Sequence, residues 1–84
     1  MTQPDRITAT PDPVQHGQKL TVCYNFAGTG LTSAELTLDY DPPVPTQKIT
    51  VTAANPCKDV TVPNAATGLI ISAPQSQDHG VTIT

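Results

Sequence analysis

The side chains that could perform acid–base or nucleophilic chemistry are few and scattered in this 84-residue chain. His16 and His79 each stand beside a glycine, in segments typical of solvated turns. No helix is expected after any of the three serines, so none forms the strand–Ser–helix elbow of a hydrolase (Ser33, Ser72, Ser76). Because no nucleophile can be combined with an acid or a base, we expect a protein without enzymatic activity.

Carboxylates and thiols make only a weak case for a metal. Asp39 and Asp41, together with Asp12, offer hard oxygen ligands that suit Ca²⁺. However, Asp39 and Asp41 share the solvent face of one predicted strand, where charges usually keep an edge soluble. Cys23 and Cys57 have no neighbouring His or Cys to complete a tetrahedral set. We therefore expect neither a bound metal nor a cofactor.

The charge and hydropathy of the chain exclude two classes of partner. The formal net charge is −3, and the basic residues are scattered (Arg6, Lys19, Lys48 and Lys58), so we expect no nucleic-acid partner. No apolar run approaches the roughly 18 residues of a membrane span, so we expect no membrane insertion. Residues 1–9, "MTQPDRITA", lack the basic start and apolar stretch of a signal peptide. The chain is expected to be soluble, as a whole gene product or a mature domain given a start Met.

The elements that must position these residues are predicted to be strands. Nine prolines and many threonines disfavour helix, and no 11-residue window carries a helical apolar stripe that is free of proline or glycine. Seven segments of alternating or apolar character are separated by turn residues (6–10, 19–26, 34–41, 47–54, 57–62, 69–73 and 81–84). This spacing predicts an all-β, seven-stranded antiparallel sandwich of two sheets with no substantial helix. A closed barrel is less favoured, because the prolines mark open edges.

Alternation and prolines add detail to this prediction. Segment 47–54 is expected to turn Ile49, Val51 and Ala53 toward the core, and the apolar segment 69–73 suits a strand buried on both faces. "PDPV" predicts an edge strand that breaks and continues displaced. "PNAATG" predicts a turn crossing between the sheets.

Three stretches together resemble a known class of domain. "ITATPDPVQHGQKLTVCYNF", "AELTLDYD" and "VTVPNAATGLIIS" are similar to small immunoglobulin-like or fibronectin-III-like domains of bacterial and phage surface proteins. The resemblance covers the whole chain and implies one domain over residues 1–84, with residues 1–5 as a flexible arm. Neither the tryptophan of the third strand nor the tyrosine before a cysteine of antibody domains is present.

The immunoglobulin-like order implies a partner for each cysteine. In that order the second and fifth strands are antiparallel neighbours, and Cys23 and Cys57 both have the parity of polar residues. If they face one another, Leu20 lies opposite Val60 and polar residues meet polar ones. This predicts a cross-strand disulfide on the outer face of one sheet, stabilising the fold by roughly 4 kcal/mol; two reduced thiols are the alternative.

The resemblance leaves two roles, both non-enzymatic. The first is a phage virion accessory protein, such as a capsid decoration or surface protein, with the start of the chain as an ordering arm. Its contact surface with a capsid or other surface protein would be the two proline-rich segments (Pro11, Asp12, Pro13, Pro42, Pro43, Val44 and Pro45). The alternative is an adhesion or accessory module of a larger extracellular bacterial protein, which would bind through loops 27–33 and 74–80. Either role implies location on a virion surface or outside a cell, and a closed homo-oligomer would favour the first.

Overall fold

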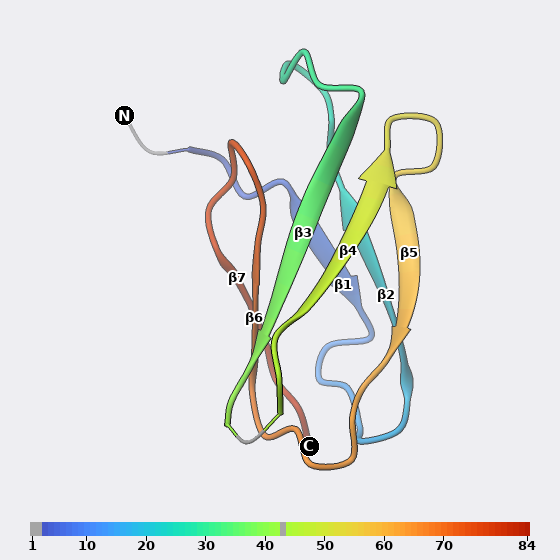
Figure 1. Ribbon diagram of the computed structural model, residues 1–84, viewed down its shortest axis with the longest axis vertical. Coiled ribbons are helices and arrows are strands. Elements are labelled where there is room, and N and C mark those ends of the chain that lie inside the picture. Colours follow the sequence, from blue (N-terminus) through green and yellow to red (C-terminus); the bar gives the residue numbers. More distant parts are fainter. Residues whose placement is uncertain (1–2, 43) are drawn as a thin grey trace.

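Seven short strands make up the regular structure of the chain. A computed structural model describes residues 3–42 and 44–84, and within them it contains no helix (Figure 1). The strands follow in order as β1 (Ile7–Thr10), β2 (Lys19–Tyr24), β3 (Ser33–Tyr40), β4 (Gln47–Thr52), β5 (Cys57–Thr61), β6 (Leu69–Ser72) and β7 (His79–Val81).

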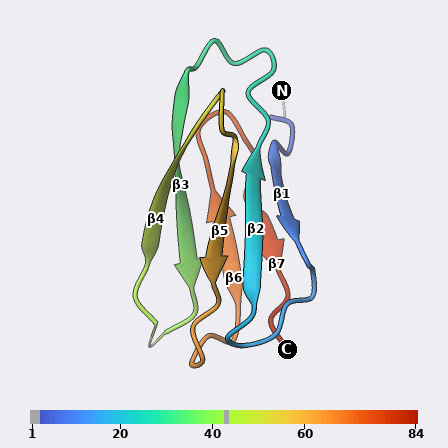
Figure 2. The ribbon, with the colours of Figure 1, turned by 90° about the vertical axis from the view of Figure 1, so that its right-hand side faces the viewer.

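The strands form two antiparallel sheets that face each other as the layers of a sandwich. One sheet has the order β1-β2-β5 and the other β4-β3-β6-β7, and every pair of neighbouring strands is antiparallel. Figure 2 shows the three-stranded sheet in front of the four-stranded one. The expected all-β sandwich of seven strands in two sheets is therefore confirmed.

Burial follows the alternation of the sequence, because successive side chains of a strand point to opposite faces. In β3 the four apolar residues are buried, while Ser33, Glu35 and Asp39 are exposed. One core between the sheets collects these side chains with those of the other six strands. Leu20, Leu36 and Ile71 are fully enclosed in it. The predicted register of β2 on β5 is also confirmed, with Leu20 opposite Val60.

Three expectations about burial and strand ends are wrong. The segment expected to be buried on both faces turns Ile70 outward, with 49% of its surface exposed, because the four-stranded sheet has only one covered face. Ala53 is exposed, since β4 ends at Thr52 in a turn closed by hydrogen bonds between Thr52 and Asn55. The last strand is residues 79–81 rather than 81–84, although Ile83 still packs against the core.

The proline-containing edge is displaced as the sequence predicts. After β1 the chain bends through cis peptide bonds before Pro11 and Pro13, then returns to the core at the fully buried Val14. Val14 forms a parallel bridge with Ile83, donating its N–H to the Thr82 carbonyl at 2.9 Å. The segment that begins as edge strand β1 of the three-stranded sheet thus pairs, beyond the bend, with the residues that follow β7 of the other sheet. The expected crossing between the sheets lies between β5 and β6, where Ala66 N–H donates to the Pro63 carbonyl.

Candidate functional site

Cys23 and Cys57 lie directly opposite each other on β2 and β5 and form a disulfide. Their Cα atoms are 4.0 Å apart, which is nearer to the spacing of about 4.5 Å in a pair without mutual backbone hydrogen bonds than to about 5.5 Å in a bonded pair. The neighbouring contact agrees, since Tyr24 N–H donates to the Pro56 carbonyl at 3.0 Å. Both sulfurs lie on the outer face of the three-stranded sheet, with Cys57 exposed and Cys23 half-buried. The cross-strand pairing expected from the resemblance is therefore present.

The polar residues around the disulfide make ordinary contacts across the sheet. Thr21 Oγ1 donates to Asp59 Oδ1 at 2.7 Å, and Lys19 Nζ lies 3.7 Å from Asp59 Oδ2. Both charged side chains are mostly exposed, so their attraction is screened and contributes less than about 1 kcal/mol. This face is held by the disulfide rather than by its charges.

A second cluster ties the start of the chain to two loops at one end of the sandwich. We call this region the loop end: residues 3–6, the β2–β3 connection 25–32 and the β6–β7 connection 73–78. The Arg6 side chain donates to three backbone carbonyls, Gln75 O at 2.9 Å, Asn25 O at 3.4 Å and Ala27 O. One guanidinium therefore bridges both loops.

Two further side chains join the loops. Gln75 Nε2 donates to the Thr29 carbonyl at 3.2 Å, and the Tyr24 hydroxyl donates to the Pro74 carbonyl. Tyr24 is buried and its ring meets the ring of Phe26 edge-on, 4.8 Å between centroids. The loop end is thus anchored from the core below it as well as across its surface.

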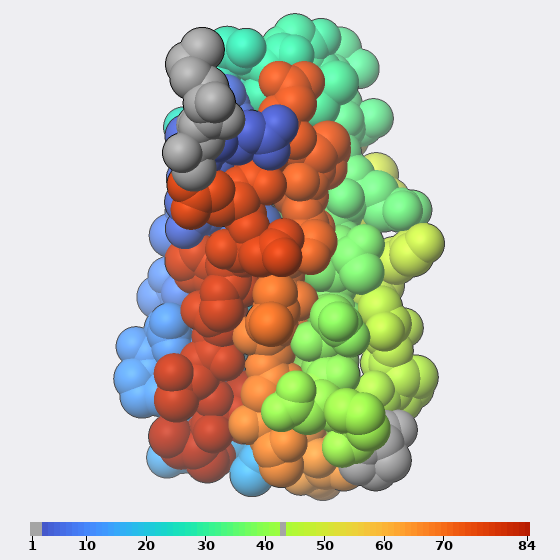
Figure 3. Space-filling view, turned by 90° about the vertical axis from the view of Figure 1, so that its left-hand side faces the viewer, coloured from blue at the N-terminus to red at the C-terminus, as the bar shows by residue number. Residues whose placement is uncertain are grey.

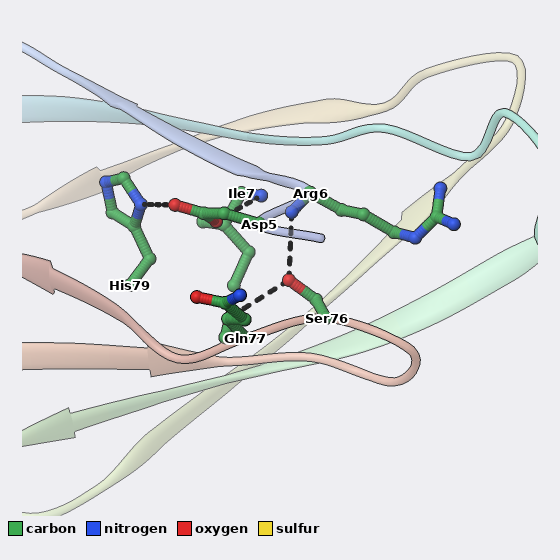
Figure 4. A network of polar contacts seen from close by, with 6 residues as sticks. All are labelled: Asp5, Arg6, Ile7, Ser76, Gln77 and His79. Atoms are coloured by element: carbon green, nitrogen blue, oxygen red, sulfur yellow. Dashed lines mark hydrogen bonds and ion pairs between the residues drawn. The ribbon is translucent and has the colours of Figure 1, made fainter. Parts of the chain in front are cut away.

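Asp5 and His79 form the polar contact that we call the N-terminal latch (Figure 4). Asp5 Oδ2 lies 2.8 Å from His79 Nδ1, and Asp5 Oδ1 accepts the Ile7 N–H at 3.0 Å. Desolvation favours the neutral carboxyl, but the hydrogen bonds from His79 and Ile7 outweigh it and lower the pKa of Asp5 below 3.8. The ionised carboxylate is the form that the latch stabilises.

Ser76 stands near this pair but takes no part in it. Its hydroxyl accepts the Arg6 N–H at 3.0 Å and donates to the Gln77 carbonyl at 2.9 Å. In Figure 4, Ser76 and the His79 ring lie on opposite sides of Asp5. An aspartate, a histidine and a serine thus lie near one another, but the serine and the histidine do not make the nucleophile–base contact that acyl transfer requires. Their shared effect is to hold the segment before β1 against the β6–β7 connection, as the space-filling view shows (Figure 3).

The other residues weighed for chemistry are kept apart by the fold. His16 Nε2 lies 2.6 Å from the Ala66 carbonyl, so it joins two turns at the far end of the sandwich. Asp12 Oδ1 accepts the Thr82 N–H, Asp39 accepts the Thr46 hydroxyl and Asp41 accepts the Thr67 hydroxyl. Over residues 3–42 and 44–84, no group of three or more His, Cys, Asp and Glu is close enough to hold a metal.

The two segments expected to form a contact surface do not lie together. Figure 2 shows the bend at residues 11–13 and the described residues of the β3–β4 connection on opposite sides of the molecule. Asp12, Pro13, Pro42 and Pro45 are exposed, whereas Pro11 and Val44 are half-buried. Pro43 lies outside the described residues. The segments are two separate surfaces rather than one.

One buried hydroxyl has no role in these clusters. Within the part of the chain that the structure describes, Tyr40 Oη has no hydrogen-bond partner, and burial raises the pKa of Tyr40. The same part of the chain carries no surface pocket, and it contains no helix of the length and hydropathy needed to cross a membrane.

Comparison with known proteins returned no match to a family model, to a curated protein or to a solved structure.

The sequence analysis did not find the loop-end cluster. Asp5 and Arg6 fall in and beside the segment expected to be a flexible arm, yet Pro4 accepts the Gln77 N–H and Asp5 contacts His79. Partners here are between 19 and 74 residues apart in the chain, so no local pattern could reveal them. The one available signal was a pair of opposite charges directly before the first strand.

Proposed function

We propose that this chain is a non-enzymatic binding module whose loop end recognises a protein partner. The observation that carries the proposal is the Arg6 side chain, which donates to carbonyls of both connecting loops. Loops that are fixed before contact lose less conformational entropy when a partner binds. A rigid scaffold that presents ordered loops at one end is a common arrangement for recognition.

The side chains exposed at the loop end favour a protein over a sugar as partner. They are mostly small or polar and able to adapt their hydrogen bonds, including Thr32, Gln77 and Asp78. A sugar-binding surface would normally offer exposed aromatic rings. Here Tyr24 is buried and Phe26 is packed against the core.

The strand order supports the resemblance on which this role was first based. Pairing β1-β2-β5 in one layer and β4-β3-β6-β7 in the other makes β2 and β5 neighbours, as the immunoglobulin-like reading requires. A disulfide on an exposed face is typical of proteins used in oxidising surroundings. We therefore propose that the module acts outside a cell or on a virion surface.

The second candidate is a virion accessory protein that contacts a capsid through the bend at residues 11–13. A specific contact favours it: Asp12 Oδ1 accepts the Thr82 N–H at 3.1 Å, which fixes the bend beside the anchored Val14. Pro13 is consequently presented on a rigid, exposed turn.

Both candidates can be tested with immobilised protein. Extracts and particles from its source are passed over it, and a retained protein is identified and purified as the partner for binding measurements. Thr32→Arg and Gln77→Arg add bulk at the loop end without removing a side-chain contact described above. Ala65→Arg is the matched control, since Ala65 is exposed in the turn at the other end of the sandwich.

We expect the loop-end variants to weaken binding of the purified partner at least about tenfold and Ala65→Arg to leave it unchanged. If both loop-end variants bind normally while Pro13→Arg does not, the second candidate replaces the first. Release of a chemically altered product from the partner would overturn the non-enzymatic assignment.

A further inference from the structure

The two flanks of the sandwich, where the edges of its sheets meet, differ in how they are closed. On the β1/β7 flank, the Val14–Ile83 bridge, the N-terminal latch and the Arg6–Ser76 hydrogen bond join the layers. On the other flank, β4 and β5 are edge strands linked by the turn at residues 53–56. The open edges of this flank are therefore the places where another strand could be added.

The alternation of hydrogen bonds identifies which groups of β4 point outward. Ala53 N–H donates to the Thr32 carbonyl, so this pair is hydrogen-bonded and every second pair along the ladder is too. Ile49 and Val51 consequently bond to β3, whereas the backbone groups of Lys48 and Thr50 point away from it. Thr52 also points outward, but its groups close the turn with Asn55.

Of the four edge strands in the described residues, β4 is the least protected against strand addition, because its only protective feature is the outward Lys48. The β1 edge is broken by Pro11 and Pro13, and β7 has three residues and is bridged by the latch. On β5, Lys58 has the parity of the buried Val60 but is exposed, which places a charge where an added strand would bury it.

In contrast, β4 has six residues without proline, and its inward residues Ile49 and Val51 are apolar. Its one charge, Lys48, lies 3.8 Å from Glu35 on the neighbouring strand of its own sheet. An open, apolar-backed edge of this length is a template for pairing with another chain.

We propose that the β4 edge binds the β4 edge of a second copy, joining two four-stranded sheets into one antiparallel sheet across a twofold axis. With the axis at Ile49, Lys48 lies opposite Thr50 of the second copy, and both outward pairs are hydrogen-bonded. Ile49 then faces its own equivalent on the inner side. No like charges lie directly opposite each other in this register, and such a pair would destabilise the sheet.

The self-complementary pattern of β4 about Ile49 favours a second copy over an unrelated strand. Glu35 lies beside Thr50 in the ladder, so the row across the junction reads Glu35, Thr50, Lys48 of the second copy, then its Thr37. Each lysine therefore meets an uncharged threonine across the junction, and the two lysines are diagonal neighbours that each keep Glu35 of their own chain as counter-ion. In the space-filling view β4, in yellow-green, borders the outer face of the sheet on which this row would lie (Figure 3).

Thr50→Pro tests the pairing with little effect on the monomer. Proline removes the outward N–H of Thr50, which the β3 ladder does not use. Asp59→Pro is the matched control, because Asp59 N–H likewise points outward from β5: Tyr24–Pro56 and Gln18–Val62 are hydrogen-bonded pairs, and the alternation leaves Asp59 unbonded to β2. Sedimentation at increasing concentration reports the oligomeric state, and circular dichroism checks that each variant folds.

We expect wild type and Asp59→Pro to dimerise alike, and Thr50→Pro to associate about tenfold more weakly or not at all. Hydrogen exchange gives a readout that needs no variant: protection of the Lys48 and Thr50 amides should rise with concentration, while that of Asp59 should not. A wild-type chain that stays monomeric at millimolar concentration overturns the proposal. So does a dimer that survives in folded Thr50→Pro, or exchange at Lys48 and Thr50 that ignores concentration.

Discussion

At the scale of single residues, the histidines show why type and spacing gave an incomplete prediction. Both were expected to be solvated; His16 is exposed but also contacts the Ala66 carbonyl, and the half-buried His79 contacts Asp5. These partners lie 50 and 74 residues away in the chain. A turn can be recognised from a glycine beside the residue, but a partner brought from a distant strand cannot.

Asp5 makes the latch sensitive to acid. Its folded-state pKa lies below the unfolded value of 3.8, so its contribution to stability is complete above that value and is lost as the pH falls through the folded-state pKa. Because the carboxylate is partly exposed, we expect less than about 1 kcal/mol in total. Urea unfolding of Asp5→Asn and wild type should differ near neutral pH, and the difference should shrink as the pH falls through the folded-state pKa of Asp5.

The control for this measurement is Asp78→Asn, since Asp78 is exposed one residue before the latch histidine. A difference in unfolding free energy between Asp5→Asn and wild type that stays constant down to the lowest pH would show that it does not come from ionisation of Asp5.

At the scale of elements, alternation predicted which strands exist and which face each one buries. It failed where an element's place in the sheet matters more than its own composition. The apolar run of β6 suggested burial on both faces, but a two-layer sandwich covers only the inner one, which leaves Ile70 outside. Likewise the alternation of β4 predicted that Ala53 points inward. The strand ends in the turn that begins at Thr52, so Ala53 lies outside it and is exposed.

Neighbouring isoleucines of β6 provide a matched pair. Ile71→Ala should lower the free energy of unfolding by about 2–5 kcal/mol, because Ile71 is fully enclosed in the core. Ile70→Ala should change it by no more than about 0.5 kcal/mol, since the side chain is half exposed. Chemical denaturation measures both values, and equal losses at the two positions would show that the outer face is covered in solution.

The disulfide acts between elements, joining β2 to β5 across 34 residues of chain. In the chain-entropy description, closing a loop of this length stabilises the native state by about 4 kcal/mol. Cys23→Ala combined with Cys57→Ala should therefore lower the free energy of unfolding by roughly that amount at any pH. Denaturation of this double variant and of reduced wild type should agree, and a loss below about 1 kcal/mol in both would show that the unfolded chain is already constrained.

At the scale of the whole molecule, the sequence predicted the layers and the disulfide but not the joining of the flanks. The register of β2 on β5 followed from placing the two cysteines opposite each other in the immunoglobulin-like order, and parity agreed, because a slip of one residue would turn the apolar side chains of one strand outward. The latch and the Arg6 contacts had no such signal, since they depend on how the start of the chain meets the β6–β7 connection. The loop end could be recognised only from the three-dimensional arrangement of both sheets.

The described start of the chain and Thr84 lie at opposite ends of the sandwich (Figure 1), and this has a mechanical consequence. Tension applied between them would pull Val14 and Ile83 past each other along their shared parallel bridge, which is a shearing load rather than an unzipping one. Once the sheets part, the 34-residue interval closed by the disulfide cannot lengthen. Single-molecule stretching should therefore release about 110–120 Å more chain under reducing conditions. The disulfide would therefore limit how far the unfolded module extends under load and would keep it close to a length from which it can refold.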